Sequence, residues 1–192
     1  MGEELDSVMN YPFRAILIDY ALENIDTPVF NRRIMSLMEN YPKEAFYSCM
    51  NLLSSHDRRR ILTVLFESEE SVMMLYKLMF ALPGVPCIYY GDEAGLKGLA
   101  DPENRAAYPW GRENKNMLSF FIELTAEYHA HSALKNGSLT MLSLDKDVAA
   151  FIRENSEERI LVLTNRCEEK KTVTFEEKEY GITPLTTVYI RL

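Results

Sequence analysis

The 192-residue chain is 47% apolar and 26% charged, so it can bury a substantial core, either as one large domain or as a medium domain with a small appendage. Its net charge of −8 argues against nucleic acid as a partner, because a surface that binds nucleic acid needs clustered cations to replace the counterions of the phosphates. No apolar stretch approaches the roughly 18 residues that cross a bilayer, so we expect no membrane partner.

The three cysteines, Cys49, Cys87 and Cys167, are odd in number and far apart. This spacing suggests neither a disulfide framework nor a set of neighbouring metal ligands. We therefore expect buried free thiols in a reducing, cytoplasmic compartment and no bound metal or cofactor. Residues 1–20 lack the basic and then apolar layout of a signal peptide. The chain begins almost inside a strand-like segment, residues 5–9, which suggests that it was cut from a longer protein.

The first part of the chain predicts a short strand and two helices. Residues 5–9 are largely apolar and are followed by Pro12, which suits entry into a helix. Apolar residues recur at intervals of three and four through residues 13–21, which indicates an amphipathic helix. Thr27 and Pro28 then supply an N-cap and a first-turn proline for a second helix over residues 29–40.

The central stretch of the chain combines a strand signal with reactive side chains. An apolar run over residues 46–53 predicts a strand that ends at His56 and Asp57, and a helical pattern follows at once. The carboxyl end of such a strand is where α/β folds carry their chemistry, so Asp57 is the first candidate for function. Alternatively, Asp57 caps the next helix and His56 is a structural histidine, and spacing alone does not decide between these interpretations.

A third strand and helix complete a βα repeat. Residues 69–81 predict a largely buried helix, because they leave little polar surface. Pro83 and Gly84 break the chain, and residues 85–90 form a short continuous apolar run of the kind that is buried on both faces of a parallel sheet. The three strand candidates, each followed by a helix, indicate an α/β fold with parallel strands.

Residues 91–116 form a long polar segment, and a segment of this length without regular structure is usually functional. Asp101 lies in it, either as a helix N-cap or as a ligand-facing side chain. Tyr108 and Trp110 lie near charged side chains, a combination that suits one face of a sugar. A helix over about residues 114–131 follows.

The pattern changes after residue 134. Five short strand-like runs separated by polar turns predict a small antiparallel β domain. They comprise residues 139–141, 148–152, 160–163, 172–175 and 187–190. We therefore expect two domains, residues 1–134 and residues 135–192, with no catalytic cluster in the second.

Four motifs stand out when the chain is taken as a whole. They are residues 8–13 (Val-Met-Asn-Tyr-Pro-Phe), 51–57 (Asn-Leu-Leu-Ser-Ser-His-Asp), 83–95 (Pro-Gly-Val-Pro-Cys-Ile-Tyr-Tyr-Gly-Asp-Glu-Ala-Gly) and 101–105 (Asp-Pro-Glu-Asn-Arg). In this order they closely resemble the α-amylase superfamily, glycoside hydrolase family 13. The nearest resemblance is to its neopullulanases, cyclomaltodextrinases and maltogenic amylases, and it covers essentially the whole chain, including a terminal β domain.

The resemblance implies a fold and a role for each candidate residue. In the family the catalytic domain is a (β/α)8 TIM barrel, and this chain would supply its C-terminal portion, about strands 6–8, followed by a small antiparallel all-β domain. By resemblance, Asp57 is the third catalytic carboxylate, which stabilises the oxocarbenium-like transition state, and His56 donates a hydrogen bond to the same sugar. Asp101 and Arg105 match the pair that binds glucose units further along the donor side of the cleft.

The chain departs from the family pattern at two points. Arg58 and Arg59 stand where the family more often has a small or polar pair, and bulky cations beside the cleft would change the substrate preference or be incompatible with activity. Ser54 replaces a common glycine.

The length of the chain limits what the resemblance implies for it alone. A (β/α)8 barrel needs about 250 residues, and only about 134 precede the β domain. Retaining glycosidases need a carboxylate nucleophile and a carboxylic acid about 5 Å apart, and the family carries these on strands four and five. The resemblance therefore implies the C-terminal fragment of a retaining hydrolase of α-1,4 or α-1,6 glucosidic bonds in maltooligosaccharides, cyclodextrins, pullulan or starch, inactive alone.

An incomplete barrel leaves unpaired strand edges, which favour pairing with another chain. We therefore expect an α-glucan oligosaccharide as a ligand, and as a protein partner either the missing N-terminal half of the barrel or a second copy of this chain. The alternative function is a non-catalytic carbohydrate-binding or assembly module.

Overall fold

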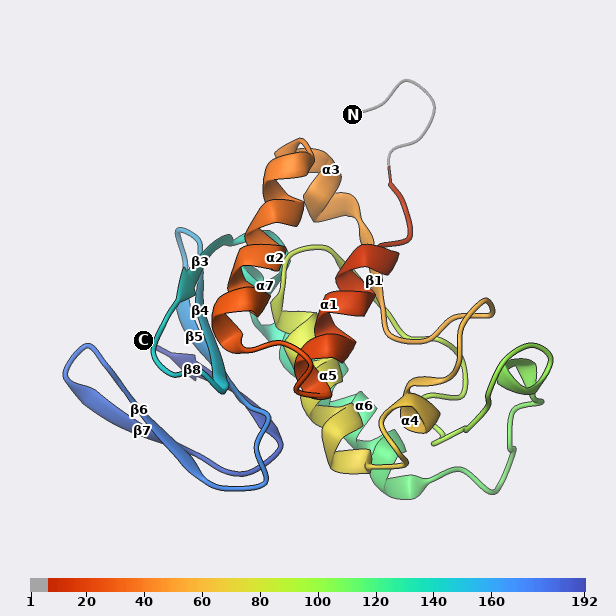
Figure 1. The fold of residues 1–192 in the computed structure, drawn as a ribbon. Coiled ribbons are helices and arrows are strands. Elements are labelled where there is room, and N and C mark those ends of the chain that lie inside the picture. Colours follow the sequence, from red (N-terminus) through yellow and green to blue (C-terminus); the bar gives the residue numbers. More distant parts are fainter. Residues whose placement is uncertain (1–6) are drawn as a thin grey trace.

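The computed structural model describes residues 7–192, and none of the helices in this range is long and apolar enough to cross a membrane (Figure 1). The helices are α1 (Tyr11–Ala21), α2 (Thr27–Asn40), α3 (Lys43–Ser48), α4 (Ile61–Val64), α5 (Glu69–Ala81), the 3-10 helix η1 (Glu103–Arg105), α6 (Lys115–Ala130) and α7 (Ser132–Asn136). The strands are β1 (Met50–Leu52), β2 (Val85–Cys87), β3 (Ser138–Leu142), β4 (Val148–Glu154), β5 (Arg159–Asn165), β6 (Lys171–Phe175), β7 (Lys178–Ile182) and β8 (Thr186–Arg191).

Three segments of the chain run parallel to one another in its first part. β1 pairs with β2 so that Met50 lies opposite Val85, and Met9 forms a parallel bridge to Met50. The N–H of Asn10 also donates to the carbonyl of Met50, 2.9 Å away. Each segment is followed by a helix, which gives the βα repeat that the sequence predicts. Part of the predicted strand over residues 5–9 lies outside the described residues.

Buried amides tie these three segments together. Asn10 donates from Nδ2 to Oδ1 of Asn51, 3.1 Å away, and Asn51 donates from Nδ2 to the carbonyl of Pro83 at 2.9 Å. Gly84 lies against Asn51 with a φ of +126°, and a Cβ at this position would collide with the Asn51 amide. A side chain at position 84 would therefore disrupt the contact that aligns the three segments.

Two boundaries predicted from the sequence are wrong. The predicted strand over residues 46–53 is helical in its first part, because α3 continues to Ser48 and β1 keeps only three residues. Phe46 is buried from this helical position, so its apolar side chain serves the core and not a strand. The N-cap of α2 is Asp26 and not Thr27, since Asp26 Oδ1 accepts the N–H of Val29 at 2.8 Å.

The C-terminal part is built on one antiparallel sheet with the strand order β3-β4-β5-β8. Helices cover one of its faces, with α5 against β5 and β8 and with α2 and α7 against β4 (Figure 1). The β6–β7 hairpin packs on part of the other face, where Val173 and Ile182 join a second hydrophobic core. The sequence pattern does not predict β7, because Gly181 and the charged Lys178 and Glu179 weaken the strand signal.

The helices and this sheet share one hydrophobic core. Ala149, Phe151, Ile160 and Val162 of β4 and β5 belong to the same buried cluster as the inward residues of α1, α2 and α5. The main core is therefore shared by the two parts of the chain, and only the smaller second core beneath the β6–β7 hairpin belongs to the C-terminal part alone.

Two buried arginines of the sheet also bind the helices. Arg166 donates from Nη1 to the carbonyl of Tyr20, 3.0 Å away, and to that of Ile25. Arg153 donates from Nη1 to the carbonyl of Ala81 at 2.5 Å, and its burial lowers its pKa to about 10. Because a buried charge is costly unless hydrogen bonds compensate it, these carbonyls fix the sheet to the ends of α1 and α5.

An apolar groove of about 630 Å³ lies between the segment after β2 and α6. Its lining includes Ile88, Leu118, Phe121 and Ile122, and Ile122 is 63% exposed. Within the described residues, β2 has no strand partner on the side away from β1, and Val85 is 52% exposed. The parallel sheet is therefore open beyond β2.

Candidate functional site

The chain leaves β1 through a segment that turns from buried to exposed. Ser54 and Ser55 are buried, whereas the side chains of His56 and Asp57 are 56% and 54% exposed. Helix α4 begins only at Ile61, whose N–H donates to Ser54 Oγ at 2.8 Å. The interpretation of Asp57 as the N-cap of the following helix is therefore wrong, and its carboxylate is available to a ligand.

Two neighbouring side chains orient the Asp57 carboxylate. Tyr11, the first residue of α1, donates from its hydroxyl to Asp57 Oδ2 at 3.2 Å, and His56 Nε2 lies 3.3 Å from Asp57 Oδ1. The Tyr11 hydroxyl also lies 3.2 Å from Ser55 Oγ. The sequence motifs do not mark Tyr11 as a site residue. The signal that indicates it is its place directly after the first parallel segment, where such folds carry functional side chains.

The loop around η1 lies against the loop that carries Asp57. Arg105 Nη2 lies 3.4 Å from Asp101 Oδ2, and Arg105 donates from Nε to the carbonyl of His56 at 3.1 Å. The structure thus brings the candidate residues His56, Asp101 and Arg105 into one surface region next to Asp57. Asp101 and Arg105 are about half exposed, so both can still contact a ligand.

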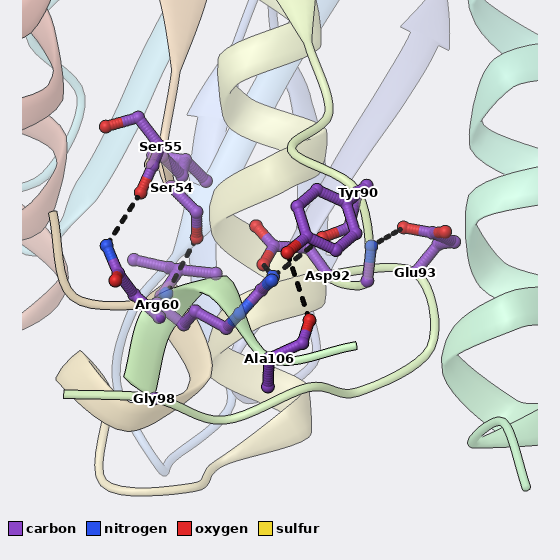
Figure 2. A network of polar contacts seen from close by, with 12 residues as sticks. Ser54, Ser55, Arg60, Tyr90, Asp92, Glu93, Gly98 and Ala106 are labelled. Carbon is purple, nitrogen blue, oxygen red and sulfur yellow. Dashed lines mark hydrogen bonds and ion pairs between the residues drawn. The ribbon is translucent and has the colours of Figure 1, made fainter. Parts of the chain in front are cut away.

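Asn104 holds the same two loops together from inside. Its side chain is fully buried and donates from Nδ2 to the carbonyl of His56 at 2.7 Å and to that of Arg58 at 3.0 Å. On the other side of this loop, the Tyr90 hydroxyl donates to the carbonyl of Ala106 at 3.0 Å (Figure 2). The sequence does not predict Asn104 as a positioning residue, because the role of its side chain depends on partners almost fifty positions away.

A buried ion pair lies beneath the surface region. Figure 2 shows that Arg60 reaches from the β1 loop to the segment after β2, where Nη1 donates to the carbonyl of Tyr90 at 2.8 Å and lies 3.1 Å from Asp92 Oδ1. Tyr76 of α5 donates to Asp92 Oδ2 at 2.5 Å. Burial raises the pKa of Asp92 to about 6, although hydrogen bonds from Ser54, Tyr76 and Arg60 act in the opposite direction.

This ion pair supports the site without touching a ligand, because the side chains of Arg60 and Asp92 are at most 1% exposed. The Arg60 guanidinium also lies over the rings of Tyr89 and Tyr90, at 4.6 and 4.9 Å from their centroids. These contacts of Arg60 fix the positions at which the loop after β1 and the loop after β2 leave the parallel strands.

The exposed groups suit a ligand that carries many hydroxyls. A carboxylate, an imidazole, a phenol and a guanidinium group offer acceptors and charged donors over one region, and such groups bind sugar hydroxyls through charge-assisted hydrogen bonds. Within residues 7–192, no three His, Cys, Asp or Glu side chains are arranged to hold a metal ion.

Parallel strands followed by helices, with polar side chains gathered where the strands end, are the arrangement of α/β folds such as the TIM barrel, in which that end carries the active site. Comparison with known proteins agrees with this assignment. The profile of the family described as "Alpha amylase, catalytic domain" matches residues 1–159. The chain therefore belongs to the α-amylase family of glycoside hydrolases.

Relatives of known function are α-glucan hydrolases. The chain is 39% identical over 179 residues to an amylopullulanase of Thermoanaerobacter thermohydrosulfuricus, a match that covers 80% of this chain and 12% of that protein. It is 33% identical over 186 residues to neopullulanase 2 of Thermoactinomyces vulgaris, covering 94% of this chain and 32% of that protein. The resemblance to neopullulanases drawn from the motifs is thus confirmed.

Among solved structures, the cyclic α-maltosyl-(1→6)-maltose hydrolase of Arthrobacter globiformis, in complex with that cyclic sugar, superposes with a TM-score of 0.93 at 30% identity. The match covers 100% of this chain and 46% of the hydrolase. The same hydrolase has also been solved with maltose. The chain therefore spans less than half of this structural relative and at most about a third of the two hydrolases compared by sequence.

Proposed function

We propose that the chain supplies part of the active site of a retaining α-glucan hydrolase, with Asp57 as the carboxylate that stabilises the transition state. The observation that carries this proposal is the Asp57 carboxylate itself, half exposed after a parallel strand and oriented by Tyr11 and His56. Cleavage of a glycosidic bond builds positive charge on the sugar ring, and a fixed carboxylate binds that charge more tightly in the transition state than in the ground state.

In this proposal the neighbouring residues bind the rest of the glucan. His56 donates a hydrogen bond to the sugar that contacts Asp57. Asp101 and Arg105 hold glucose units further along the donor side, supported by the hydrogen bond that keeps Arg105 against the His56 carbonyl. The substrates are α-1,4-linked or α-1,6-linked glucans such as maltooligosaccharides, cyclodextrins, pullulan or starch.

We further propose that residues 1–134 correspond to strands 6–8 of the barrel and that residues 135–192 are the C-terminal β domain. Retaining hydrolysis needs a nucleophile and an acid about 5 Å apart, and in this proposal both come from polypeptide outside residues 7–192. The open side of β2 and the groove along α6 support a covering partner there, either the N-terminal barrel half or a second copy.

The alternative is a carbohydrate-binding or assembly module that performs no hydrolysis. It is favoured by the presence of ligand-binding groups, Asp101 and Arg105 among them, in a chain that covers less than half the length of its structural relative.

The three free cysteines, of which Cys49 is buried and the other two are partly buried, support a reducing cytoplasmic location.

Calorimetric titration with acarbose and maltoheptaose, combined with assays of maltoheptaose and pullulan hydrolysis, tests the proposal. We expect binding without turnover for the chain alone, and about tenfold weaker acarbose binding by Asp57→Asn. Glu179→Gln, the same chemical change on the exposed β7 strand, is the matched control and leaves binding unchanged. Hydrolysis by the chain alone would refute the proposal that the nucleophile and the acid come from other polypeptide. Absence of binding would refute a glucan site on this chain.

A further inference from the structure

The loop that carries Asp101 and Arg105 continues into an exposed aromatic pair. The rings of Tyr108 and Trp110 lie with their centroids 4.5 Å apart at an angle of 49°. Trp110 is 81% exposed and is the single tryptophan of the chain, whereas Tyr108 is partly buried. Tyr108 therefore supports the indole from one side and leaves most of its surface in water.

Trp110 lies on a turn that hydrogen bonds hold in one conformation. The Trp110 N–H donates to the carbonyl of Tyr108 at 3.0 Å, and the Arg112 N–H donates to that of Pro109 at 2.8 Å. Gly111 follows with a φ of +75°, and its N–H donates to Glu113 Oε1 at 3.0 Å. An exposed indole on such a turn binds a flat apolar surface with little further loss of conformational entropy.

The pair lies close to the ligand-binding end of the same loop. Arg105 is held against the carbonyl of His56, and the next residue, Ala106, accepts a hydrogen bond from Tyr90. Tyr108 is three positions beyond Arg105, so the Cα atoms of these two residues are at most about 11 Å apart. Trp110 follows two positions further along the same loop, with its ring against that of Tyr108.

From these observations we infer that Tyr108 and Trp110 form a stacking site for a glucose ring of the α-glucan, beyond the Asp101–Arg105 pair. The inference rests on the proposed function, which supplies the glucan. The ring of glucose has an apolar face of C–H groups and a rim of hydroxyls. The indole takes the face, and the exposed Arg112 and the partly buried Glu113 offer a donor and an acceptor to the rim.

Because Trp110 is the only tryptophan, its fluorescence reports on this site alone. Titration of the chain with maltoheptaose should shift or quench the emission, with the dissociation constant that calorimetry gives. Maltotriose, bound at Asp57 and the Asp101–Arg105 pair, should leave the emission nearly unchanged. If maltoheptaose binds in the calorimeter and the emission does not respond, the stacking site is refuted while the proposed function stands.

Variants separate stacking from a loss of fold. Trp110→Ala should weaken maltoheptaose binding about fivefold and leave maltotriose binding unchanged, and Trp110→Phe should retain most of the affinity. Phe66→Ala removes an aromatic side chain that is 84% exposed after α4, and it should change neither affinity. Equal weakening of both sugars by Trp110→Ala would refute the stacking site.

Two further results would overturn the inference. An emission shift that grows with protein concentration and ignores maltoheptaose would mean that a second copy covers the indole. Failure of every maltooligosaccharide to bind, with the melting curve of the folded chain intact, would refute the proposed function and the stacking site together.

Discussion

The side-chain amide of Asn104 donates a 2.7 Å hydrogen bond to the main-chain carbonyl of His56. This contact joins the loop after β2 to the loop after β1 directly beneath the exposed carboxylate of Asp57. Because Asn104 is fully buried, neither water nor another side chain of the described residues can replace it without rearrangement.

Asn104→Ala is therefore expected to lower the free energy of unfolding by about 1–3 kcal/mol, because it removes the hydrogen bonds of a fully buried amide to the carbonyls of His56 and Arg58, and only the His56 carbonyl keeps another donor, Arg105. It should also weaken acarbose binding, since the two loops lose their relative position. Urea denaturation and calorimetry measure the two effects. Asn116→Ala, which removes an exposed amide at the start of α6, is the control; equal effects of both changes would contradict the role of Asn104.

Tyr11→Phe is expected to weaken acarbose binding by about 0.5–1.5 kcal/mol with little effect on folding, because it removes the 3.2 Å hydrogen bond to Asp57 and keeps the ring. The effect should depend on the carboxylate. In the background of Asp57→Asn, Tyr11→Phe should weaken acarbose binding clearly less. A double-mutant cycle by calorimetry gives the coupling free energy between Tyr11 and Asp57. Fully additive effects would show that Tyr11 does not act through Asp57.

Asp92 should make the folded state less stable as the pH rises from about 4 to about 6. Burial raises its pKa in the folded state from 3.8 to about 6, so the folded chain holds a proton in this range that the unfolded chain has released. The contribution of this group to the free energy of unfolding then falls by at most about 1.4 kcal/mol for each pH unit, and it levels off above pH 6.

The comparison that isolates this effect is between the wild-type chain and Asp92→Asn. Urea denaturation at intervals between pH 4 and pH 7 should give a difference in unfolding free energy that changes with pH in this window only. Parallel pH profiles for the two proteins would refute the raised pKa.

The chain is expected to self-associate at micromolar concentrations when it is alone, since the side of β2 and the groove along α6 are open. Sedimentation velocity at increasing concentrations measures this association. Ile122→Asp should reduce it by placing a charge in the groove, whereas Leu99→Asp, on the polar loop, should not. A strictly monomeric wild-type chain would contradict the expectation.

Local signals in the sequence were enough for the longer helices. The prediction of residues 69–81 matches α5, because Ser68 caps its first turn and Pro83 follows its end. Short strands were less predictable. β1 keeps three residues of an eight-residue apolar run, and β7 begins with two charged residues and contains Gly181. In both cases burial by distant segments, and not the local pattern, decides the structure.

The candidate site likewise contains residues that the sequence predicts and residues that it does not. His56, Asp57, Asp101 and Arg105 were singled out because motifs carry them, and the structure brings them into one region. The residues that hold them there were not predicted. Asn104, Tyr11 and Tyr76 act through partners between 16 and almost 50 positions away, and no periodicity in the sequence encodes such contacts.

The hydrophobic core shared by the helices and the antiparallel sheet has a consequence for chimeric proteins. A chain ending at residue 134 would expose the surfaces of α2 and α5 that now meet β4 and β5, and it would aggregate before it could pair with anything else. Exchanging this β domain for that of another family member should succeed only when the residues of both helices that face the sheet are exchanged with it, and when the new domain keeps an arginine at position 166 for the main-chain carbonyls of Tyr20 and Ile25.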